Sequence, residues 1–213
     1  MVVQYLLLGI LWLLYGSIHS LLAASFVKKK MQTWLENGFR FYRLCYTVFA
    51  FVFLAVLIVF EWRISVALLF HSSQVIRVFG IALALAGIFL MILCGRKYFM
   101  GVSGLRSLFD EKKDQELLVG GIHQYVRHPL YLGTFAFIWG WFLAFPFISL
   151  LISNTIITMY TLVAIRFEER KMIDEFGDAY ILYRKKVPAL IPSLKLFRRP
   201  RKESPPEKGI SPI

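Results

Sequence analysis

Charged residues are scarce in this sequence, whereas long apolar runs are abundant. Asp, Glu, Lys and Arg make up 18% of the 213 residues, hydrophobic residues make up 58%, and the mean hydropathy is +0.62. A soluble domain of this length is normally about half apolar and carries more charge. Because the apolar residues stand in long blocks, the composition argues against a soluble domain and indicates a membrane protein.

Cysteines and nucleotide-binding glycines are also few. Only Cys45 and Cys94 occur, each inside an apolar block, which argues against a disulfide framework and leaves no metal-ligand spacing. The chain contains no G-x-G-x-x-G, so a Rossmann-type dinucleotide site is disfavoured. The first apolar block lacks a basic segment before it and is too long for a signal peptide, so we expect an uncleaved span.

Five apolar segments approach the roughly 20 residues that a helix needs to cross a bilayer. They run over residues 3–26, 44–60, 76–94, 129–145 and 147–165, whereas residues 64–70 are too few and should lie at the interface. Spans in lipid must be helical, because a helix satisfies its own backbone hydrogen bonds. The sequence therefore predicts an all-α polytopic bundle of about five transmembrane helices, with a tight hairpin between the last two.

The basic residues predict the orientation of this bundle. An outside amino terminus places 23 of the 25 Lys and Arg residues on the cytoplasmic side, as the positive-inside rule requires. The net charge of +12 then suits anionic membrane lipid. No nucleic-acid partner is expected, because the last sixteen residues lack aromatic side chains for stacking.

Three regions follow from this pattern. Residues 1–116 should form the first three membrane helices and their loops, 117–194 the hairpin with a C-terminal cofactor-binding region, and 195–213 a disordered basic tail. The oligomeric state is not indicated.

Polar residues flank the predicted hairpin on its cytoplasmic side. The turn at Phe145-Pro146-Phe147 is so short that Arg127 and His128 before it should meet Glu168 and Glu169 after it. A helix beginning at Pro129 would offer free N–H groups to an anion, and the two glutamates would suit a cation. S-adenosylmethionine (SAM) carries a carboxylate, an ammonium and a sulfonium, and this layout fits it.

Three motifs resemble the membrane methyltransferases of the isoprenylcysteine carboxyl methyltransferase type. These motifs are GIHQYVRHPLYLG, the RFEE pair and FGDAYILYRKKVPALIP, which fall in order between residues 117 and 192. The superfamily includes phospholipid N-methyltransferases, NnrU-like proteins and bacterial methanethiol S-methyltransferases. The chain has only Gly120-Gly121 where phospholipid members carry a G-x-G element, which weakens the case for a phospholipid acceptor.

The resemblance implies SAM as cofactor, bound at the cytoplasmic face, and a small thiol or a lipophilic, prenylcysteine-like or lipid-like acceptor. The residues that it assigns to SAM binding are Tyr125, Arg127, His128, Pro129, Tyr131, Gly133, Glu168, Glu169, Tyr180, Tyr183 and Pro188. His128 or a glutamate such as Glu169 could act as a base, and Arg166 could hold an anionic acceptor.

Other interpretations stay open. Sterol-reductase-type enzymes carry a similar hairpin but use NADPH, and a non-enzymatic NnrU-like transporter or assembly factor could retain the scaffold. Arg127 and His128 could merely snorkel to the interface, and the glutamates could begin a solvated helix. His19, deep in the first span, could make an interhelical hydrogen bond or line an acceptor pocket.

Overall fold

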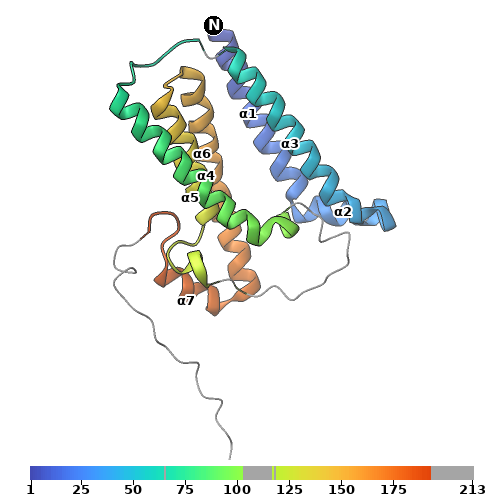
Figure 1. Cartoon of the computed structure of the whole chain (residues 1–213). Helices are drawn as coiled ribbons and strands as arrows, with labels where there is room; N and C mark the ends of the chain where they lie inside the picture. Colours follow the sequence, from blue (N-terminus) through green and yellow to red (C-terminus); the bar gives the residue numbers. More distant parts are fainter. Residues whose placement is uncertain (65, 103–116, 118, 193–213) are drawn as a thin grey trace, which may run out of the picture.

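The computed structural model describes residues 1–64, 66–102, 117 and 119–192 (Figure 1). These residues are helical and include no strand, apart from an isolated bridge between Leu68 and Phe147. The predicted tail at 195–213 lies outside them. The elements are α1 (Val2–Ala23), α2 (Ser25–Leu35), η1 (Glu36–Gly38), α3 (Phe39–Ile64), α4 (Gln74–Val102), η3 (Gly121–Gln124), α5 (Pro129–Ala144), α6 (Ile148–Phe176) and α7 (Asp178–Lys186).

The prediction of an all-α membrane bundle is confirmed, and its fourth predicted span ends within one residue of the predicted boundary. Four helices in the described part are long and apolar enough to cross a bilayer, and they lie at Val2–Ala23, Leu44–Ile64, Gln74–Gly95 and Ile148–Phe176. The fourth predicted span became α5, which has 16 residues. At 1.5 Å per residue it is about 24 Å long, less than the roughly 30 Å of a hydrocarbon core.

The bundle has two different ends (Figure 1). The start of α1, the α3–α4 connection and the α5–α6 turn lie at one, which we call the turn end. The helices α2 and α7 lie at the opposite end, which we call the basic end. The helix α2 carries Lys28, Lys29 and Lys30, and α7 carries Arg184, Lys185 and Lys186. The grouping of loops that the basic residues predicted is therefore present in the fold.

Glycines let α4 and α5 pack with their backbones in contact. A Cβ atom built on Gly87 would lie 2.5 Å from the carbonyl oxygen of Gly133, and one on Gly80 would lie 2.6 Å from that of Gly140. Nothing larger than glycine fits at such distances without moving a helix. Small residues at matched intervals are the usual means by which membrane helices approach closely.

The segment predicted to lie alone at the interface instead pairs with the hairpin turn. The Leu69 N–H donates to the Pro146 carbonyl at 2.8 Å, and the Ile148 N–H donates to the Ala67 carbonyl at 3.0 Å. Backbone groups that the turn cannot satisfy internally thus find partners at the turn end.

The hairpin itself is confirmed. The Asn154 side-chain amide on α6 donates to the Ile138 carbonyl at 2.7 Å, and the Trp139 indole donates to the Thr158 hydroxyl at 3.1 Å. The last span does not end at residue 165, because α6 continues to Phe176 before Gly177 breaks it at φ +53°. Glu168 and Glu169 therefore stand on a helix continuous with the membrane span.

Candidate active site

Arg127 and His128 stand immediately before α5, with Pro129 in the first turn, where its missing N–H costs nothing. The Arg127 N–H donates to the Pro188 carbonyl at 2.9 Å, and the His128 N–H donates to the Ala189 carbonyl at 3.0 Å. These two N–H groups are therefore not free for an anion. Instead, the C-terminal segment uses them to fix both residues.

The hairpin brings the four charged residues together as predicted. The Arg127 Nη1 lies 2.6 Å from Glu169 Oε1, and the His128 Nε2 lies 3.2 Å from the same oxygen. The Arg184 Nη1 from α7 lies 3.7 Å from Glu169 Oε2. We call Arg127, His128, Glu168, Glu169 and Arg184 the charged cluster. Its contacts are charge-assisted, which makes them stronger than neutral hydrogen bonds.

The two glutamates have different surroundings. The Glu169 side chain is only 13% exposed and contacts three basic residues. The Glu168 side chain is 43% exposed, accepts a hydrogen bond from the Tyr131 hydroxyl at 3.0 Å and lies 3.8 Å from His128 Nδ1. Glu169 is thus held in place by the protein, whereas Glu168 keeps open access for a cationic ligand.

Two tyrosines of α7, Tyr180 and Tyr183, pack beside the charged cluster and η3. Tyr180 is 3% exposed, and burial, helped by the negative charge of Glu169, raises the pKa of its phenol. The Tyr183 hydroxyl donates to the His123 carbonyl at 2.6 Å and so connects α7 to η3. The predicted contact between the closing segment and the hairpin flank is present.

The remaining predicted site residues lie around or outside the charged cluster. Tyr131 stacks on the His128 ring with centroids 5.7 Å apart, and Tyr125 is half-buried at the end of η3. Gly133 faces α4, so its visible role is packing. Arg166 is exposed on α6, and no contact with the charged cluster is recorded for it among the described residues.

Sequence reasoning missed Arg184 and the carbonyls of Pro188 and Ala189. Arg184 follows Tyr180 by four residues, so both lie on one face of α7, and this spacing was a usable signal. The carbonyls offered no side-chain signal, since any residue supplies one.

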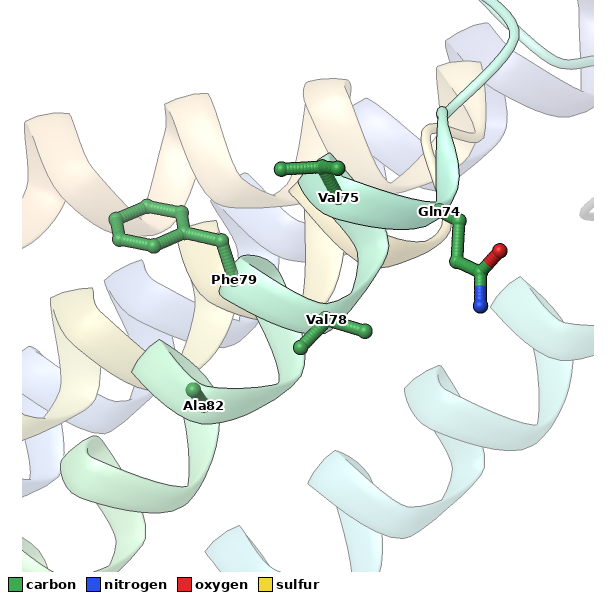
Figure 2. Close-up of a pocket in the computed structure, with 5 residues that line it drawn as sticks. All are labelled: Gln74, Val75, Val78, Phe79 and Ala82. Atoms are coloured by element: carbon green, nitrogen blue, oxygen red, sulfur yellow. The ribbon is translucent and has the colours of Figure 1, made fainter.

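A shallow hollow elsewhere on the surface is unrelated to this cluster. It lies at the turn end of α4 and is lined by five residues of that helix, namely Gln74, Val75, Val78, Phe79 and Ala82 (Figure 2). Val75 and Phe79 are 79% and 62% exposed. An open apolar face of this kind suits contact with lipid chains.

Comparison with known proteins gives a family match over the part of the chain that contains the hairpin. Residues 75–179 match the phospholipid methyltransferase family, and this stretch includes the hairpin and both glutamates. The match is with a family of membrane methyltransferases and covers just under half of the chain. The motifs that suggested a membrane methyltransferase from sequence thus lie largely inside the matched region.

Individual proteins similar to this chain are also methyltransferases. The chain is 38% identical over 94 residues to a methanethiol S-methyltransferase of Crocosphaera subtropica, covering 42% of this chain and 36% of the relative. It is 41% identical over 81 residues to a protein-S-isoprenylcysteine O-methyltransferase of Schizosaccharomyces pombe, covering 38% and 34%. It is 39% identical over 103 residues to methanethiol S-methyltransferase 2 of Bradyrhizobium diazoefficiens, covering 45% and 38%.

The similarity is partial in extent. The aligned stretches span little more than a third of the length of these curated relatives. No solved structure gives a significant match. All three relatives are named as methyltransferases, which favours methyl transfer over the reductase and transporter alternatives.

Proposed function

We propose that the protein is a membrane-embedded, SAM-dependent methyltransferase whose methyl donor binds at the charged cluster and whose acceptor is a small thiol or a lipophilic molecule. The observation that supports this most directly is the meeting of Arg127 and His128 with Glu168 and Glu169 at the mouth of the α5–α6 hairpin. This meeting lies inside the region that matches the methyltransferase family.

The groups present fit the donor's charges. Glu168 keeps 43% of its side chain exposed and suits an ammonium or sulfonium group, while the half-exposed Arg184 suits a carboxylate. Arg127 is 10% exposed and already paired with Glu169, so it serves to hold that carboxylate in place. When bound, SAM would supply an electrophilic methyl group, and its displacement neutralises positive charge.

The chain's own contribution is positioning and proton handling. A site shielded from water that aligns donor and acceptor accelerates such a displacement by proximity. A neutral thiol must also lose a proton. Both oxygens of Glu169 already face basic residues, so the more exposed Glu168 or the nearby His128 Nδ1 is better placed to accept that proton.

The proposal also includes the orientation of the chain in the membrane. We place the amino terminus outside and the basic end, with the charged cluster, at the cytoplasmic leaflet, where SAM is available. The concentration of basic residues at that end supports this orientation.

Calorimetry on the detergent-purified protein tests the proposal. SAM should bind to the wild type, and Glu168→Gln should weaken that binding at least tenfold. Glu175→Gln provides a matched control, because Glu175 is exposed on the same helix α6. NADPH should give no heat of binding. Absence of SAM binding to the wild type, or equal affinity in Glu168→Gln, would overturn the proposal.

A further inference from the structure

A histidine in the first membrane helix has a buried nitrogen without a partner. The Nδ1 atom of His19 on α1 is inaccessible, and no hydrogen bond to it exists among the described residues. The ring lies 6.0 Å from that of Tyr15 and 5.9 Å from that of Tyr46 on α3, measured between centroids. An unpaired buried polar atom typically costs about 1–3 kcal/mol, so it calls for an explanation.

Packing alone does not supply that explanation. Of the two roles that the sequence left open for His19, an interhelical hydrogen bond through Nδ1 is not found in the described part of the chain. A phenylalanine could stack on Tyr15 and contact Tyr46 in the same way without burying a nitrogen. Polar residues inside membrane spans usually mark a functional site.

His19 lies beside residues that lead toward the charged cluster. Its neighbour Ser20 forms a 2.8 Å hydrogen bond with the Tyr160 hydroxyl of α6. Tyr160 is close enough to both Tyr15 and Tyr131 to interact electrostatically with them. Tyr131 in turn donates to Glu168. Tyr160 therefore lies between the surroundings of His19 and Tyr131, the tyrosine that donates to the more accessible glutamate.

The fold makes room for this connection at Gly16. A Cβ atom built on Gly16 would lie 3.0 Å from the Tyr160 ring. The glycine thus lets that ring lie flat against α1, where its hydroxyl can reach Ser20.

We propose that His19, with Tyr15, Tyr46 and Tyr160, forms the acceptor-binding end of the site, and that the acceptor is a small neutral thiol held by an S–H hydrogen bond to Nδ1. This inference rests on the proposed methyltransferase function and adds the place and class of the acceptor. The four side chains include no Lys or Arg, so they offer no permanent positive charge to the carboxylate of a prenylcysteine. Their aromatic faces suit a small apolar body with a soft sulfur atom.

Thermal unfolding in detergent without SAM tests the site, with 1-butanethiol and N-acetyl-S-farnesylcysteine as probes. Butanethiol should raise the unfolding temperature of the wild type, whereas His19→Phe should need at least tenfold more thiol for the same rise. His19→Phe keeps the ring stacking and removes the buried nitrogen, so it should fold. Ser17→Ala is the matched control, because Ser17 is exposed on the same helix, and it should respond like the wild type.

Other outcomes overturn the inference. Stabilisation by the farnesylcysteine probe alone would contradict the thiol class, and equal response of His19→Phe and wild type would remove His19 from the site. SAM calorimetry on the same samples separates the two proposals. If SAM binds to wild type and His19→Phe alike while butanethiol has no effect, only the acceptor site is wrong; if SAM does not bind to the wild type, the methyltransferase function is wrong.

Discussion

At the scale of single residues, the adjacent Glu168 and Glu169 have different roles in the proposed site. Glu169 is nearly buried and balances the charge of Arg127 and Arg184, whereas Glu168 is more open and has a neutral hydroxyl as its hydrogen-bond donor. The sequence RFEE indicated that both acids belong to the site. It could not rank them, because their exposure depends on α7, which approaches only one of the two.

The different surroundings of the two glutamates predict that Glu169→Gln mainly lowers stability, whereas Glu168→Gln mainly weakens SAM binding. Glu169→Gln should lower the free energy of unfolding by up to roughly 3–5 kcal/mol, since it leaves the buried Arg127 without its counter-charge. Glu168→Gln should cost under about 1 kcal/mol, because its pair is partly exposed, yet it should weaken SAM binding. Thermal unfolding of both variants in detergent measures the difference. Equal destabilisation would contradict the assignment.

The buried phenol of Tyr180 predicts a pH effect. Its folded-state pKa lies above the ordinary tyrosine value near 10, so the unfolded chain loses this proton first. The stability that it contributes is therefore complete below about pH 10 and is lost as pH rises toward the folded pKa. Tyr180→Phe should reduce the loss of unfolding temperature between about pH 9 and pH 11 relative to wild type. Parallel pH curves for the two proteins would speak against it.

At the scale of elements, the contact between α4 and α5 sets where the hairpin stands. Gly133 matched a motif for cofactor binding, but the fold shows its backbone against α4. Sequence reasoning could find the helices from their apolar runs. It could not find this contact, because glycines in one membrane helix do not identify the partner helix, and Gly80 and Gly87 were not singled out.

The packing predicts a contrast between two glycines of α4. Gly87→Ala should destabilise the protein by about 1–3 kcal/mol, since its Cβ would meet backbone atoms of α5 that cannot rotate away. Gly95→Ala should be neutral or stabilising by about 0.5–1 kcal/mol, because nothing lies within 4 Å of its Cβ position and alanine favours a helix. Detergent unfolding midpoints test this. A neutral Gly87→Ala would show that the helices separate easily.

At the scale of the whole molecule, the sequence predicted the order of the five apolar helices, including α5 to within one residue, but it did not predict the helix α2. Long apolar runs can be read directly from the sequence and predict the membrane spans. The basic loops likewise predict which connections lie on the same side of the membrane. The pairing of residues 67–69 with the hairpin turn was missed, because it depends on two connections that meet only after the bundle forms.

The proposed orientation predicts the behaviour of reporter fusions. Green fluorescent protein fused to the C-terminus should fluoresce, because that end faces the cytoplasm, and alkaline phosphatase fused at the same point should be inactive. Phosphatase inserted at residues 70–73, in the connection between α3 and α4, should be active. The reverse pattern in bacterial cells would refute an outside amino terminus and with it a cytoplasmic site.

The backbone bonds from Arg127 and His128 to Pro188 and Ala189 also set an order of assembly during synthesis. Donors and acceptors are separated by the whole hairpin and α7, so α5 and α6 enter the bilayer before the acceptors have left the ribosome. A chain truncated before Pro188 and released from the ribosome would still hold α5 and α6 in the bilayer but would lack both of these bonds. The contact between the hairpin and the C-terminal segment can thus form only after residues 188 and 189 have been translated.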